Sequence, residues 1–68
     1  MKISARNVIE GTVKDVKKGT TTAHVHVDVT GGIVTSSITN ESIDDLGLKP
    51  GTKVKVVIKS SDVMLAVD

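Results

Sequence analysis

Apolar and polar residues alternate along most of the chain, which is the pattern of half-buried β-strands. The clearest run covers 22–29, where Ala23 and three valines alternate with polar residues. A looser alternation over 3–16, with Ile3 and Val13 on the apolar face, predicts a long first strand. Runs over 33–38 and 53–59 predict a third and a fourth strand. Residues 63–67 are apolar on both faces, which predicts a fifth strand whose second buried face lies at a subunit interface.

Turn and capping residues divide these strands. Gly31-Gly32 separates the second and third predicted strands, and this dipeptide indicates a tight hairpin with positive φ at both glycines. The segment 39–42 carries a capping residue and an acid, and Gly47 and Pro50 are stop signals, so a single short helix is predicted between the third and fourth strands. Five strands with a helix in this place predict an all-β fold, an OB-like Greek-key barrel, which is an architecture that binds many kinds of ligand.

The length of 68 residues predicts one domain over 1–68, and a domain of this size buries only about 60% of its unfolded surface. Small domains recruit disulfides, a metal or partner subunits, and the chain has no cysteine for a disulfide or a thiolate metal site. The sequence therefore predicts a homo-oligomer.

Charge and composition limit the classes of partner that we expect. The net charge is +1 with both signs interspersed, and there is no aromatic residue to stack on a base, so nucleic acid is not an expected partner. No apolar run reaches the roughly 18 residues of a membrane span, and the N-terminus has no apolar stretch typical of a signal peptide. We expect a soluble, cytoplasmic protein without a membrane partner.

The two ends of the chain carry complementary anion-binding groups. Ser4 and Arg6 are two residues apart, so in an extended segment both side chains project from one face. Lys59 is followed by Ser60 and Ser61, and adjacent strand residues point to opposite faces, so these reach one ligand only at a strand end or a bulge. Fixed positive charge with neutral hydroxyl donors suits a compact tetrahedral oxyanion. A polar turn before the last strand is the ordinary alternative for Lys59 to Asp62.

The segments 3–7, 38–43, 46–48 and 59–64, in this order and spacing, resemble the molbindin, or Mop domain, family over nearly the whole chain. The resemblance implies an OB-like barrel that exchanges N-terminal strands and assembles into a hexamer, as a trimer of dimers. It also implies molybdate or tungstate held at subunit interfaces for storage or homeostasis. The oxyanion-binding residues that it implies are Ser4, Arg6, Lys59, Ser60 and Ser61, with Thr39 and Ser42 facing an anion bound mainly by a neighbouring subunit.

Some of these residues also suit a second role. Thr39 and Ser42 are spaced as the N-cap and third residue of a helix, and capping competes for the same hydroxyl. Gly19 to Thr22 is a candidate for a second kind of anion site, or an ordinary glycine-led turn. An OB-type nucleic-acid or protein interaction module is the alternative function, and Lys53, Lys55 and Lys59 are its only support.

Catalysis and metal binding find less support in the sequence. No recognisable motif places a nucleophile beside a base, so no enzyme is predicted. His24, His26 and Asp28 share one strand face, yet no further firm ligand accompanies them, so no metal site is predicted.

Overall fold

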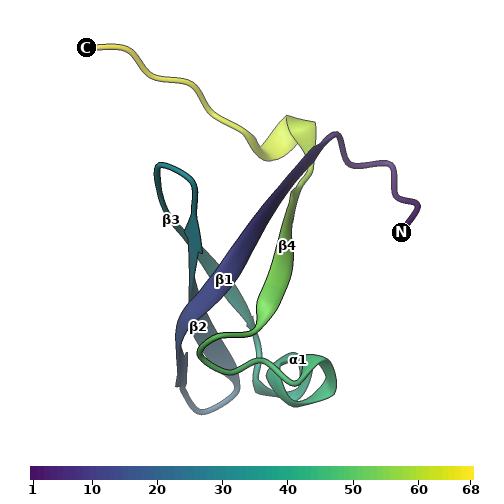
Figure 1. Ribbon diagram of the computed structural model, residues 1–68, viewed down its shortest axis with the longest axis vertical. Helices are drawn as coiled ribbons and strands as arrows, with labels where there is room; N and C mark the ends of the chain where they lie inside the picture. Colours follow the sequence, from purple (N-terminus) through teal and green to yellow (C-terminus); the bar gives the residue numbers. More distant parts are fainter.

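The computed structural model describes residues 1–68 and is mostly β, with one antiparallel sheet and one short helix (Figure 1). The strand order in the sheet is β3-β2-β1-β4. The helix α1 lies between β3 and β4 in the chain, as the sequence predicts. The bounds are Asn7–Lys18 for β1, Thr22–Val29 for β2, Gly32–Thr39 for β3, Asn40–Leu46 for α1, Lys53–Ile58 for β4 and Ser60–Asp62 for a 3-10 turn.

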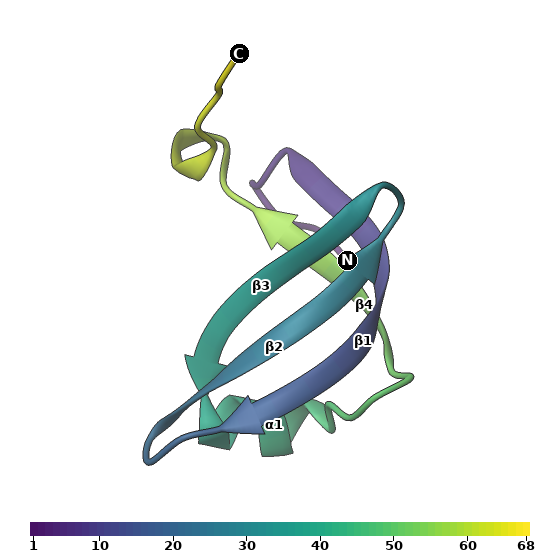
Figure 2. The same ribbon diagram turned by 90° about the vertical axis from the view of Figure 1, so that its left-hand side faces the viewer.

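β1 is the strand around which the sheet curls. Its first half pairs with β4 and its second half pairs with β2, so the sheet bends back on itself (Figure 2). A bulge between Val13 and Asp15 shifts the register. Because a bulge inserts one extra residue, the inward face changes from odd to even positions there. Val13 lies opposite Val27 and Val16 lies opposite Val25, so side chains on both sides of the bulge pack in or against the core.

The core is small and aliphatic. Its five buried residues include the inward face of β2, which confirms the predicted valine face. Ile43 of α1 packs against these strands from one end of the sheet. Gly47 ends the helix in the left-handed conformation with φ 63°, and the backbone N–H of Leu48 donates to the carbonyl of Ile43 at 3.0 Å. The buried residues are Val13, Ala23, Val25, Val27 and Ile43.

The hairpin between β2 and β3 differs from the prediction. Val29 pairs with Gly32, so the two-residue turn is Thr30-Gly31 and Gly32 belongs to β3. Of the two glycines in this hairpin, only Gly31 has positive φ, at 90°. A turn with positive φ at its second central residue needs a single glycine there, which corrects the predicted Gly31-Gly32 turn with two positive φ angles.

The predicted first and fifth strands are also corrected at the two ends of the chain. Residues 1–6 precede β1 and pair with nothing in the sheet, so the first strand begins at Asn7 and not at Ile3. The segment 63–67 forms no strand, so the single chain holds four strands and no closed five-stranded barrel. A strand requires a neighbour to bond, and within one chain neither segment has one. Both segments leave the end of the β1–β4 ladder in different directions (Figure 1).

The chain exposes more surface than a compact domain of its mass. Its accessible surface is 5415 Å², whereas a folded monomer of 7.1 kDa has about 4,100 Å². The radius of gyration is 12.7 Å, against about 11 Å for a compact chain of this length. Met64, Leu65 and Val67 are each more than nine-tenths exposed. Part of the exposed surface is therefore apolar.

Gly11 allows the close approach at which β1 crosses over the core. A Cβ on Gly11 would lie 2.6 Å from Cγ1 of Val27 and 2.8 Å from the carbonyl oxygen of Asp28. The second contact is with backbone, which moves only if the strand itself shifts. Gly32, by contrast, has no atom within 4 Å of such a Cβ and has no positive φ.

We predict that Gly11→Ala lowers the free energy of unfolding by about 1–3 kcal/mol, because the added methyl overpacks the crossing of β1 and β2. Gly32→Ala is the control and should change stability by less than about 0.5 kcal/mol. Urea denaturation at one fixed protein concentration measures both variants. Equal stability of the two would contradict the close approach at Gly11.

Candidate functional site

The β1–β4 ladder brings the two cationic groups from opposite ends of the sequence to one place. The last pair of this ladder is Asn7 with Ile58, and the Asn7 side-chain amide donates to the Ile58 carbonyl at 3.2 Å. Arg6 directly precedes this pair and Lys59 directly follows it. Both side chains are exposed. Two fixed positive charges therefore lie at the same end of the ladder, as the predicted anion site requires.

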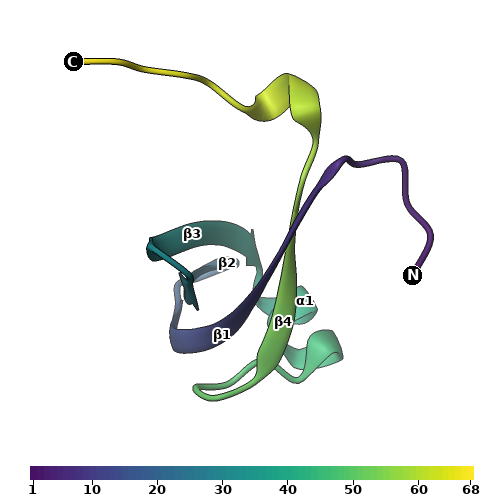
Figure 3. The ribbon, with the colours of Figure 1, turned by 45° about the horizontal axis from the view of Figure 1, so that its top comes forward.

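The serines on either side of this ladder end are arranged differently. β4 ends at Ile58, and Ser60 and Ser61 begin the 3-10 turn, in which the Asp62 N–H donates to the Lys59 carbonyl at 2.9 Å. The predicted strand end before Ser60 is therefore present. Ser4 lies on the other side, in the exposed segment before β1, and the two segments diverge from the ladder end (Figure 3). The exposed Asp62 carboxylate is the one acidic group next to these residues in the chain.

Thr39 and Ser42 form a second group at the start of α1. Thr39 is the N-cap, and its hydroxyl oxygen accepts from the Ser42 N–H at 3.1 Å. The two hydroxyl oxygens lie 2.8 Å apart and share a hydrogen bond. The cap uses the Thr39 hydroxyl oxygen as an acceptor, and the bond between the two hydroxyls uses the hydrogen of one of them. One O–H of the pair is left to donate to an outside acceptor.

The two groups lie at opposite ends of one chain. Lys18, at the far end of β1, makes an ion pair of 2.6 Å with Asp44 of α1, which places the helix at that end. Arg6 precedes the other end of this 12-residue strand, and α1 and the start of β1 lie at opposite ends of the sheet (Figure 1). One chain therefore does not bring Thr39 and Ser42 to an anion held by Arg6 and Lys59. A second chain is needed if all of them bind one ligand.

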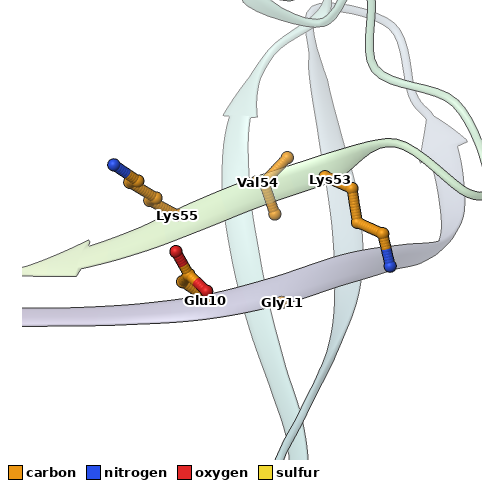
Figure 4. A pocket seen from close by; sticks show the side chains of 5 residues that line it. All are labelled: Glu10, Gly11, Lys53, Val54 and Lys55. Atoms are coloured by element: carbon orange, nitrogen blue, oxygen red, sulfur yellow. The ribbon is translucent and has the colours of Figure 1, made fainter.

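A surface hollow on the outer face of β1 and β4 holds none of the predicted site residues. It is lined by Glu10, Gly11, Lys53, Val54 and Lys55 (Figure 4). Glu10 lies directly opposite Lys55 in the ladder, and the Lys53 ammonium donates to the Thr12 hydroxyl at 3.1 Å. A carboxylate among the lysines opposes the binding of an anion. It also interrupts the basic row that a nucleic-acid interface would use.

The histidines face outward from β2 and form no cluster of metal ligands. His26 Nδ1 lies 2.6 Å from a carboxylate oxygen of Asp15, next to the bulge in β1, and the donor depends on the tautomer of the ring. His24 is exposed on the same face. No group of three or more His, Cys, Asp or Glu residues is placed to hold a metal ion. The His26–Asp15 contact links β2 to β1 across the bulge.

Asn40 is a structural residue that the sequence pattern does not single out. Its side-chain amide donates to the carbonyls of Gly19 and Thr20 at 2.9 and 3.3 Å, and its backbone N–H donates to the Thr21 carbonyl at 2.9 Å. These bonds hold the loop between β1 and β2 against the start of α1. The loop 19–21 therefore has a packing role that the sequence does not reveal. None of the helices is long and apolar enough to cross a membrane.

Comparisons with known proteins give consistent matches over nearly the whole chain. Residues 3–65 match the family model described as TOBE domain. The chain is 54% identical over 66 residues to molybdenum-pterin-binding protein 3 of Clostridium pasteurianum, which covers 96% of this chain and 97% of that protein.

Two solved structures are similar in fold. A molybdate-binding protein from Sporomusa ovata matches with a TM-score of 0.93 at 40% identity, covering 98% of this chain and 100% of that one. The cytoplasmic molybdate-binding protein ModG, solved with molybdate bound, matches with a TM-score of 0.94 at 43% identity. That match covers 100% of this chain and 49% of ModG, so this chain spans about half of the ModG chain.

We predict that Thr39→Ala lowers the free energy of unfolding by about 1 kcal/mol, because the Ser42 N–H loses its side-chain acceptor. Thr39→Ser keeps the hydroxyl and should retain most of this stability. Thermal unfolding followed by circular dichroism compares the two variants. A loss of the same size in both would show that the threonine methyl group matters, and not the cap.

Proposed function

The chain belongs to the TOBE domain family, and on this premise we propose that it binds molybdate or the similar oxyanion tungstate for storage or homeostasis. The observation that carries the proposal is the end of the β1–β4 ladder, where Arg6 and Lys59 flank the Asn7–Ile58 pair. The relatives named above are called molybdenum-pterin-binding or molybdate-binding proteins, which supports the choice of ligand.

The proposed ligands are Arg6 and Lys59 for charge, with hydroxyls from Ser4, Ser60 and Ser61. A molybdate dianion accepts hydrogen bonds through four oxygens and donates none. Guanidinium, ammonium and hydroxyl groups are donors, and charge-assisted bonds of this kind are about twice as strong as neutral ones. Discrimination from sulfate, which has the same charge and shape, would come from the size of the cavity, since molybdate and tungstate are larger.

We propose that Thr39 and Ser42 of a second chain complete the site with their one remaining O–H donor. Their separation from Arg6 within a chain supports a site between subunits. The 1–68 chain would act as one domain in a homo-oligomer, as a hexamer built from three dimers. A segment of another chain would then supply the fifth strand that closes the barrel. The excess exposed surface of the single chain supports such an assembly.

Binding without catalysis is the proposed activity. The relatives named above are described as binding proteins, and the proposed site combines donors without a nucleophile next to a base. We also propose a cytoplasmic location, because ModG is described as cytoplasmic. Storage or homeostasis needs reversible binding of the anion, which charged groups at an exposed ladder end permit.

We predict that calorimetric titration of the anion-stripped protein with molybdate gives micromolar or tighter binding. Sulfate at the same ionic strength is the control and should give little heat. Tungstate should resemble molybdate. Absence of heat with both molybdate and tungstate would overturn the proposed function, and an equal response to sulfate would overturn its size selectivity.

We predict that Arg6→Ala weakens molybdate binding about 10- to 100-fold, which corresponds to the loss of a charge-assisted hydrogen bond worth about 1.5–3 kcal/mol. Lys14→Ala is the matched control, because it removes the same charge from an exposed position in the middle of β1. Titration calorimetry measures the affinity, and circular dichroism checks that both variants fold. Unchanged affinity in folded Arg6→Ala would remove Arg6 from the site.

A further inference from the structure

We propose that Asn7 is a positioning residue of the oxyanion site, which closes the end of the β1–β4 ladder and so holds Lys59 beside Arg6. The inference rests on the proposed function, and it adds a residue that touches no anion. Asn7 is not among the predicted ligands, because sequence spacing reveals no partner for its side chain. In the structure that partner is the Ile58 carbonyl, which accepts from the Asn7 side-chain amide at 3.2 Å.

Asn7 occupies a position that the strand pattern would give to an apolar residue. It lies on the inward face of β1, two residues before Ile9, and Ile9 lies opposite Val56, which packs against the core. Asparagine is depleted in strands, because its side chain competes for backbone hydrogen bonds. Asn7 is nevertheless half-buried, and so is its pair Ile58. The side-chain bond to the Ile58 carbonyl accounts for a polar residue at this inward position.

The bond from Asn7 acts on the backbone of both cationic residues. The Ile58 carbonyl belongs to the peptide unit that joins Ile58 to Lys59. Peptide units are planar, so a bond to this carbonyl also orients the backbone N–H of Lys59. The backbone nitrogen of Asn7, in turn, belongs to the peptide unit that follows Arg6. One hydrogen bond therefore connects the peptide unit before Lys59 to the residue after Arg6.

The backbone of Lys59 is also held on its other side. The Lys59 carbonyl accepts from the Asp62 N–H at 2.9 Å, and Lys59 itself is extended, with φ −65° and ψ 135°. Both peptide units that flank Lys59 thus accept a hydrogen bond, one from β1 and one from the 3-10 turn. The lysine side chain is long and flexible, so a fixed backbone limits the volume that its ammonium group explores.

A ladder end without this bond would hold the two charges less firmly. The last pair of a ladder has a bonded neighbour on one side only, so it frays more readily than the pairs inside. A dianion that binds a frayed end must first order both segments, and this ordering lowers the affinity. The Asn7 amide reduces that cost and brings no charge of its own. Arg6 and Lys59 supply the electrostatic part of the binding.

The variant Asn7→Leu removes the donor and keeps the size and branching of the side chain. We expect molybdate affinity to fall about threefold to tenfold, which corresponds to one neutral hydrogen bond. Thr12→Val is the matched control, because it removes another side-chain bond of the same ladder, which the Lys53 ammonium donates at 3.1 Å. This control should leave the affinity unchanged. Titration calorimetry measures the affinity, and circular dichroism checks that each variant folds.

Two results of this comparison would overturn the proposal. One is unchanged affinity in folded Asn7→Leu. The other is an equal loss in Thr12→Val, because it would show that any weakening of the β1–β4 ladder lowers the affinity.

A double-mutant cycle with Lys59→Ala separates positioning from direct contact. Because Asn7 acts by holding Lys59, Asn7→Leu should lower the affinity by less than about twofold once the Lys59 side chain is absent. A contact between Asn7 and the anion would instead give the same loss in both backgrounds. That result would overturn the positioning role.

Amide hydrogen exchange tests the ladder end without any anion. In the anion-free protein, followed by NMR, Asn7→Leu should speed exchange at least about threefold for the hydrogen-bonded amides of 7–9 and 56–58 and leave those of β2 unchanged. Equal rates in the wild type and the variant would overturn the closure of the ladder end by Asn7. A wild type that binds neither molybdate nor tungstate would overturn the proposed function, whereas faster exchange in the variant would still show that Asn7 holds the ladder end.

Discussion

The pairing of β1 with two neighbours is the constraint on which the rest of the structure depends. A strand of 12 residues bonds to β4 along one half and to β2 along the other, so it must bend. Gly11 gives room at the crossing, and the bulge after Val13 restores the inward direction of the side chains. The curled sheet that results encloses the small aliphatic core. The same pairing joins the two ends of the sequence at Asn7 and Ile58.

Local patterns in the sequence predict the parts of the fold that neighbouring residues decide. The valine face of β2 follows from strict alternation, and α1 follows from its cap at Thr39 and its stop at Gly47. The bulge and the role of Gly11 depend on contacts between residues far apart in the chain, so alternation alone does not find them. A Cβ on Gly11 would lie only 2.6 Å from Cγ1 of Val27, and this closeness arises only when the sheet is packed. The apolar residues of 63–67 predict a fifth strand, and that strand lacks a partner within the chain.

The candidate site likewise has one part that the sequence predicts and another that only the structure shows. Residue chemistry selects Arg6 and Lys59, and their convergence becomes visible only in the register of the β1–β4 ladder. The spacing of Thr39 and Ser42 suits either a cap or an anion. The structure places them in a cap that leaves one hydroxyl hydrogen free. Sequence spacing gives no information on which end of the sheet a residue occupies, and so it does not reveal that these two groups lie apart.

The bond between the Asn7 side chain and the Ile58 carbonyl joins positions 51 residues apart. Contacts of such long range form late, because the loop between them must close first. Arg6 and Lys59 stand next to this bond in the chain, so their proximity exists only in the folded ladder. Local opening of the β1–β4 pairing would leave both charges on the chain and would separate them in space.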